Sequence, residues 1–142
     1  MKVQFALATA VSAISLLAAA PLQARTIHFS TALNGASEVP PNTTPGTGTV
    51  DADLDTATNG FHYTVTYSGL TGPAVAAHFH GPAAAGANAP PIIMIEKLPS
   101  PIKGSAVLSA DQAKDLLAGK WYFNVHTAAN PGGEIRGQLI AP

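Results

Sequence analysis

Three histidines are the side chains of this sequence best placed to do chemistry together. His78 and His80 are one residue apart, and His126 lies near the C-terminus. If the first two lie in a β-strand, both imidazoles project from the same face, because side chains alternate between faces along a strand. A third imidazole from a distant strand would complete a metal site. Three neutral imidazoles suit Cu(II), and Zn(II) would also accept them. The spacing therefore predicts a metal site at His78, His80 and His126.

Other kinds of site are poorly supported. The chain has no cysteine, which excludes disulfides, thiolate nucleophiles and thiolate metal sites. It has no Gly-x-Ser-x-Gly motif, and its acidic residues Asp51, Asp53 and Asp55 alternate as on a solvated strand face. The basic residues are few and scattered, so nucleic acid is not an expected partner.

The N-terminus has the features of a secretory signal peptide. Lys2 precedes an uncharged, apolar run over residues 5–20, and Pro21 and Ala24 follow it. Such a run is short for a membrane span and ends at a small residue, so we expect cleavage after about residue 24. The mature protein would then be one domain, residues 25–142, with a net charge of about −2. We expect it to be exported, either periplasmic or secreted, with no membrane attachment after cleavage.

Short segments rich in β-branched and aromatic residues recur between Gly, Pro and Asn. This pattern predicts an all-β fold, an antiparallel Greek-key sandwich or barrel of about seven to eight strands. One short connecting helix is expected from the N-cap Ser109, with Gln112 three residues on, to Gly119. The predicted strands are residues 26–33, 46–54, 61–67, 75–80, 92–97, 102–108, 121–126 and 134–140.

Alternation within the predicted strands assigns side chains to two faces. Apolar side chains should point into the core, and these include Val75, Ala77, Phe79, Trp121, Phe123 and Val125. Met94 is expected in the core as well. The three histidines and Arg136 then share the outer, polar face, where they could meet only under a loop that folds over it. Candidates to orient the second nitrogen of each imidazole are Asn124, Asn130 and Glu134.

Two segments resemble the CHRD domain, which is named for its occurrence in chordin. They are residues 77–83, Ala-His-Phe-His-Gly-Pro-Ala, and residues 125–139, which run from Val-His-Thr to Gly-Gln-Leu. The resemblance covers nearly the whole mature chain. It implies either a domain like those of chordins, which are secreted antagonists of bone morphogenetic proteins, or a single exported bacterial domain. Most such bacterial domains have no assigned role, so the resemblance alone does not imply a function.

A more distant resemblance is to Cu/Zn superoxide dismutase. Residues 67–72, Tyr-Ser-Gly-Leu-Thr-Gly, followed by His78 and His80, are similar to a strand, turn and His-x-His pair of that enzyme. This similarity implies a superoxide dismutase-like fold, copper ligands at His78, His80 and His126, and Arg136 guiding superoxide or another small anion. The chain lacks a matching bridging histidine, a zinc-ligand cluster in residues 82–91 and both cysteines of the enzyme's disulfide. A zinc site is therefore not expected.

Three functions remain open from the sequence. The first is an exported copper-binding domain in which the three histidines converge on one ion. The second is a copper-only, superoxide dismutase-like enzyme, which also needs an open coordination position and Arg136 aimed at it. The third is a metal-free protein-interaction module, which predicts separated histidines and an exposed apolar patch or free sheet edge.

Overall fold

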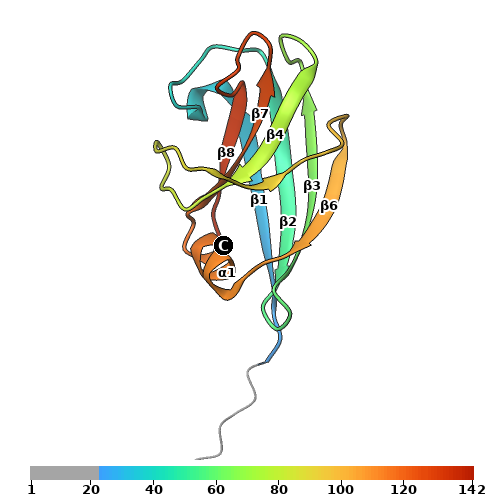
Figure 1. The fold of residues 1–142 in the computed structure, drawn as a ribbon, viewed down its shortest axis with the longest axis vertical. Helices are drawn as coiled ribbons and strands as arrows, with labels where there is room; N and C mark the ends of the chain where they lie inside the picture. Colours follow the sequence, from blue (N-terminus) through green and yellow to red (C-terminus); the bar gives the residue numbers. More distant parts are fainter. Residues whose placement is uncertain (1–22) are drawn as a thin grey trace, which may run out of the picture.

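The computed structural model describes residues 23–142, which form an all-β domain with one α-helix (Figure 1). The predicted signal peptide, residues 1–24, lies almost wholly outside the described residues. The elements in chain order are β1 (Thr26–Asn34), the 3₁₀ turn η1 (Gly35–Ser37), β2 (Thr47–Asp55), β3 (Gly60–Ser68), β4 (Ala74–His80), β5 (Pro91–Met94), β6 (Ile102–Val107), α1 (Ala110–Leu117), β7 (Trp121–Thr127) and β8 (Ile135–Leu139).

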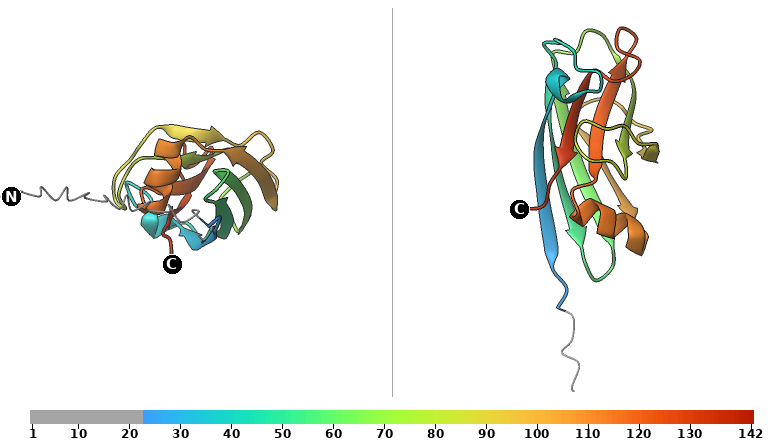
Figure 2. Two further views of the ribbon diagram at one scale, coloured as in Figure 1. Left: turned by 90° about the horizontal axis from the view of Figure 1, so that it is seen from below. Right: turned by 90° about the vertical axis from the view of Figure 1, so that its left-hand side faces the viewer.

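All eight strands join one antiparallel sheet in the order β5-β4-β7-β8-β1-β2-β3-β6. The sheet curls around its own core, as the end-on view in Figure 2 shows. Three connections, β3 to β4, β5 to β6 and β6 to β7, join strands that are not neighbours in the sheet, as Greek-key connections do. The predicted fold class is confirmed, and β4 and β7 lie side by side.

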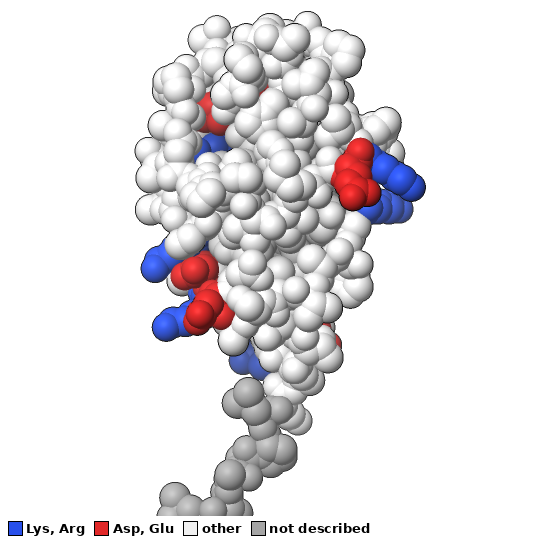
Figure 3. Space-filling model, viewed as in Figure 1, with Lys and Arg blue, Asp and Glu red and all other residues white. Residues whose placement is uncertain are grey.

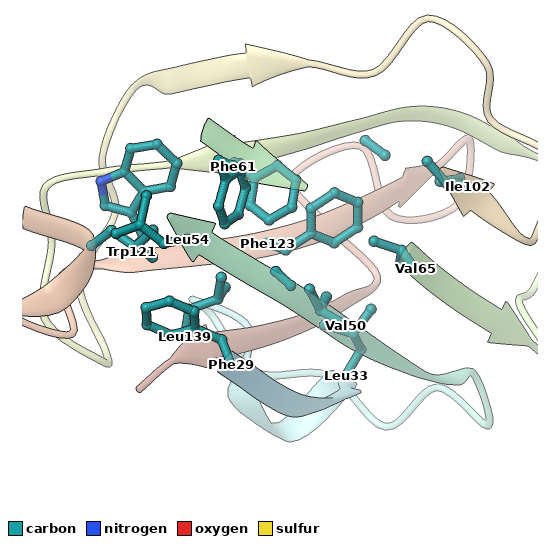
Figure 4. Packing of buried hydrophobic residues seen from close by; sticks show 14 of the residues in the cluster. Phe29, Leu33, Val50, Leu54, Phe61, Val65, Ile102, Trp121, Phe123 and Leu139 are labelled. Carbon is teal, nitrogen blue, oxygen red and sulfur yellow. The ribbon is translucent and has the colours of Figure 1, made fainter. Parts of the chain in front are cut away.

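The concave side of the sheet holds the hydrophobic core. Phe61, Trp121 and Phe123 are fully buried and belong to this core (Figure 4). Phe79 is also fully buried and packs against Phe61 and Phe123. Their rings meet edge to face, with centroids 5.3 Å apart for Phe61 and Phe79 and 4.7 Å apart for Phe79 and Phe123. Edge-to-face contact is a favoured geometry of aromatic pairs, so this cluster fixes the inner face of β4 and β7. Their outer face is then available for polar side chains.

The connecting helix begins and ends where the sequence predicts. Ser109 is its N-cap: the Ser109 hydroxyl accepts a bond from the Gln112 backbone N–H, and the Gln112 side chain accepts one from the Ser109 backbone. This capping box satisfies two N–H groups at the start of the helix. Gly119 follows the C-cap with a φ of 71°, a left-handed conformation that favours glycine.

Two side chains predicted to be buried are exposed instead. Val75 is 57% exposed, because the β4–β7 register shifts between Ala74 and Ala76 and breaks the alternation at that point. Met94 is 62% exposed, because it lies opposite His78 on the outer face, at the end of the short edge strand β5. The remaining inward assignments in β4 and β7, Ala77, Phe79, Trp121, Phe123 and Val125, are confirmed.

Charged side chains of the described residues form small, separate groups on the face shown in Figure 3, and most of that face is uncharged. Within residues 23–142, no helix has both the length and the apolar character needed to cross a bilayer.

The approach of β8 to β1 gives a test of this fold. A Cβ atom on Gly137 would lie 2.4 Å from the Ala32 carbonyl oxygen, which is part of the β1 backbone and cannot rotate away. We expect Gly137→Ala to reduce the free energy of unfolding by about 1–3 kcal/mol, the usual cost of overpacking. A Cβ on Gly72 would meet nothing within 4 Å, so Gly72→Ala should change stability by less than about 0.5 kcal/mol. Urea denaturation of both variants measures the difference, and equal stability would contradict the close β1–β8 packing.

Candidate metal centre

The β4–β7 pairing brings the three histidines onto one patch of the outer face. His78 pairs with Asn124, His80 with Tyr122, and Ala76 with His126. Since antiparallel partners on one face have neighbouring side chains, this register places His126 beside His78 and Asn124 between the histidine pair and Arg136. His80 is buried, and His78 and His126 are half-buried.

The imidazole nitrogens converge. His78, His80 and His126 each offer one nitrogen, and the three nitrogens lie within 4.8 Å of one another. His78 Nδ1 is 3.2 Å from His126 Nε2. The rings of His78 and His80 meet edge to face, with centroids 5.3 Å apart. The three predicted residues therefore lie together, and the separated histidines expected for a metal-free module are not observed.

Backbone carbonyls bind the second nitrogen of two of the rings. His80 Nδ1 donates to the Ala89 carbonyl oxygen at 2.9 Å, and His126 Nδ1 donates to the Pro131 carbonyl oxygen at 3.0 Å. A carbonyl oxygen can only accept, so both Nδ1 atoms carry a proton, and in the neutral form of each ring Nε2 presents a lone pair. This is the usual way in which a protein fixes the tautomer and orientation of a metal-binding histidine.

The environment favours the neutral form of two rings. Burial first, and then the neighbouring His126 and His80, lower the pKa of His78 to about 4. Burial also lowers the pKa of His80, more than its hydrogen bonds to Ala89 and Asn124 raise it. Metal ligation requires the unprotonated nitrogen, so His78 and His80 do not need to lose a proton to water before binding at neutral pH.

Asn124 lies beneath the histidines. Its Oδ1 atom is 2.9 Å from His80 Nε2 and 2.9 Å from His126 Nε2. Asn124 had been expected to orient second ring nitrogens; instead it contacts the nitrogens that face the site. Asn130 and Glu134, the other two candidates, do not contact the histidine rings in the described structure: Asn130 Nδ2 donates to Thr71, and Glu134 binds threonines.

Tyr122 separates the histidine site from Arg136. Its ring stacks on His80 with centroids 4.6 Å apart and an angle of 3° between planes. The Arg136 guanidinium carbon lies 3.4 Å from the centre of the Tyr122 ring. Arg136 is only 1% exposed, and its terminal nitrogens donate to the Ala87 carbonyl oxygen at 2.6 Å and to Asn88 Oδ1 at 2.9 Å. Arg136 therefore holds the loop over residues 81–90, which also supplies the carbonyl that orients His80.

Glu134 secures the other loop beside the site. Its buried carboxylate accepts hydrogen bonds from the hydroxyls of Thr44, Thr71 and Thr127 and from the Thr71 backbone N–H, at 2.5–2.8 Å. Burial works to raise the pKa of Glu134, but these hydrogen bonds outweigh it and lower the pKa to about 2. One carboxylate thus joins three segments and fixes the turn that carries Pro131, the partner of His126.

A second buried carboxyl, Glu38, lies on the far side of Asn124. It is 4% exposed, and its Oε1 atom has no hydrogen-bond partner among the described residues. Desolvation raises the pKa of Glu38 to about 7, although the charge of Arg136 and a hydrogen bond from Asn124 both work to lower it. The amide NH₂ of Asn124 therefore points toward Glu38, and its oxygen points toward the histidines.

The predicted metal residues thus lie together, while several of their partners had not been predicted. Asn124 and Tyr122 share the outer face with the histidines by the same alternation, so their proximity followed from the strand register. Ala89 and Pro131 contribute main-chain oxygens, which leave no pattern of residue types. Glu38 comes from the distant segment after η1, and no spacing relates it to the histidines.

Comparison with known families and proteins gave one match. The family described as CHRD domain matches residues 29–139, which include every strand that carries the site. No curated protein and no solved structure matched the chain.

The Glu134 cluster predicts a particular acid sensitivity. A carboxyl whose pKa is lower in the folded protein stabilises the fold above its unfolded pKa of 4.5, and this stabilisation is lost as pH falls toward about 2. We expect Glu134→Gln to lose up to about 3 kcal/mol at pH 7, and the difference from the wild type to shrink between pH 5 and about pH 2. Denaturation at a series of pH values measures this difference. A constant difference across that range would contradict the assignment, and Glu96→Gln, a substitution at an exposed glutamate, is the control.

Proposed function

Because this chain belongs to the CHRD domain family and its histidines converge, we propose that it is an exported single-domain protein that binds one copper ion through His78, His80 and His126. The observation that carries the proposal is the orientation of the rings. His80 and His126 are held with Nδ1 on a carbonyl and Nε2 toward the site, beside His78 Nδ1. When bound, copper would supply one-electron redox chemistry at this position.

The donor set supports copper among the available ions. Imidazole nitrogens suit Fe, Ni, Cu and Zn. The affinity of such a site for divalent ions rises from Fe(II) through Ni(II) to a maximum at Cu(II), and it is lower for Zn(II). The chain has no thiolate to favour a closed tetrahedral zinc site. Met94 lies opposite His78 in the β4–β5 pair, but it is 62% exposed. Three imidazoles and no thiolate therefore support Cu(II) over a soft Cu(I) site.

Without metal, the three nitrogens need a proton between them. When both rings are neutral and Nδ1 of His126 donates to Pro131, the 3.2 Å contact is made by a proton on His78 Nδ1. Binding through His78 Nδ1 would move this proton to Nε2 of the same ring or to solvent. Binding thus exchanges one hydrogen bond for metal ligation without rearranging the backbone.

Export is supported by the family and by the N-terminal residues. CHRD domains are found in extracellular proteins, and the apolar run before residue 24 has the composition of a signal peptide. A periplasmic or extracellular location also exposes the half-buried His78 and His126 to ions outside the cytoplasm.

Copper binding is tested with the mature, untagged protein, residues 25–142. Titration with Cu(II) against a competing chelator should show one tight equivalent, with nitrogen hyperfine structure in the electron paramagnetic resonance spectrum. We expect His78→Ala combined with His126→Ala to lower the affinity by at least about 100-fold, since two of three ligands are lost. His62→Ala, at an exposed histidine of β3, is the matched control and should bind as the wild type does. Weak binding that is unchanged by the double variant would contradict the proposal.

A second candidate is a copper-only, superoxide dismutase-like enzyme. The observation that favours it is that the positive charge of Arg136 acts on the site, where it helps to lower the pKa of His80. The same residue is buried under residues 81–90 and both terminal nitrogens are already bonded, which supports a structural role for it. Binding without efficient turnover is therefore the function we favour.

Superoxide decay in the presence of the copper-loaded protein separates the two candidates. For a binding protein we expect decay no faster than with an equal amount of a copper–histidine complex, and little dependence on ionic strength. An enzyme that guides an anion with Arg136 would show faster decay that falls as salt increases, and Arg136→Lys would keep part of this effect. Faster, salt-dependent decay would contradict binding without turnover and would favour the enzyme.

A further inference from the structure

Four electron-pair donors, and not three, face one another at this site. They are His78 Nδ1, His80 Nε2, His126 Nε2 and Asn124 Oδ1. Ala89 and Pro131 bind the Nδ1 atoms of His80 and His126, so the Nε2 atom of each ring is the one that faces the Asn124 oxygen. That oxygen lies 2.9 Å from each of the two Nε2 atoms. Either a proton on Nε2 or a metal ion among these atoms makes so close an approach favourable.

The other side of the Asn124 amide faces Glu38. The NH₂ group donates to the Glu38 carboxyl, which leaves the amide oxygen on the side of the histidines. Asn124 is buried in the middle of β7, opposite Arg136 on β8, so its amide is enclosed by charged and polar side chains. The side facing the histidines is the one left for the oxygen.

The two distances from Asn124 to the histidines match one coordination geometry, and the third donor distance, 3.2 Å from His78 Nδ1 to His126 Nε2, is intermediate. With bonds of about 2.0–2.1 Å, two ligands at a right angle are about 2.9 Å apart, and two ligands at a tetrahedral angle are about 3.3–3.4 Å apart. Asn124 Oδ1 lies at 2.9 Å from both Nε2 atoms. These two contacts therefore fit adjacent positions of a square, which Cu(II) prefers, better than a tetrahedron, which Zn(II) prefers.

We propose that Asn124 is the fourth ligand of the copper site and that its amide oxygen, at a right angle to His80 and His126, selects Cu(II) over Zn(II). This inference rests on the proposed function and deepens it. The set becomes three nitrogens and one oxygen, all uncharged. Asn124 also closes the inner side of the site, so any further ligand must approach from the side of the half-buried His78 and His126.

The test compares Asn124→Leu, which keeps the approximate size and removes the oxygen, with Asn124→Asp, which keeps an oxygen. We expect Asn124→Leu to weaken Cu(II) binding by about 10–100-fold, the range seen when partners of metal ligands are removed, and to weaken Zn(II) binding less. Asn124→Asp should retain at least the wild-type Cu(II) affinity. In water enriched in ¹⁷O, the copper resonance of Asn124→Leu should broaden beyond that of the wild type, because a water molecule replaces the amide oxygen.

Broadening by ¹⁷O distinguishes a ligand from a side chain that only positions the imidazoles. Equal affinity and equal broadening in the wild type and Asn124→Leu would overturn the inference. A loss of affinity without added broadening would overturn it too, and would assign Asn124 a positioning role. Thermal unfolding verifies that each variant is folded, and Asn124→Ala replaces Asn124→Leu if the latter does not fold. If copper binding depends on the histidines but is unchanged by substitution of Asn124, only this inference is refuted. If copper binding does not depend on the histidines, the proposed function is refuted as well.

Discussion

The antiparallel register between β4 and β7 determines which side chains form the site. His78 lies opposite Asn124 and His80 lies opposite Tyr122, so these four side chains share the outer face, while Phe79 and Phe123 fill the core behind them. Because the side-chain period of a strand is two, a slip of one residue would move the histidines into the core and the phenylalanines into water. The buried aromatic cluster therefore fixes the register, and the register in turn fixes the ligand set.

A polar site on the outside of a sheet needs cover to become a binding site. The loop over residues 81–90 provides it on one side, held by Arg136, and the turn before β8 provides it on the other, held by Glu134. Each holding residue is charged and buried, and each is compensated: Arg136 by Ala87, Asn88 and the Tyr122 ring, and Glu134 by three threonines. Buried charges are tolerated only with such partners. The carbonyls of Ala89 and Pro131 reach the histidine rings because these loops are fixed.

Prediction from the sequence succeeded where a local pattern repeats and failed where the pattern is interrupted. Alternation located all eight strands, and the Ser109–Gln112 spacing located the helix. Val75 was assigned to the wrong face because no residue pattern marks the register shift in β4. Met94 was wrongly placed in the core because an apolar run does not reveal that its strand lies at an edge of the sheet. In the site, residue types indicated the three histidines. Main-chain oxygens and a carboxyl from a distant segment have no such signature, since only the folded chain brings them there.

The charge of the donor set bears on which ions it could retain. Three imidazoles and an amide oxygen contribute no negative charge, the carboxyl of Glu38 lies beyond Asn124, and the positive charge of Arg136 lies on the other side of Tyr122. Ca²⁺ and Mg²⁺ depend on carboxylates and water and would gain little here. A transition ion that bonds strongly to imidazole depends less on charge, so selectivity would follow from ligand type and angle. The hydrogen bonds to Ala89 and Pro131 hold the rings before binding, so less side-chain entropy is lost when an ion binds. This smaller entropy loss compensates in part for the lack of a carboxylate ligand.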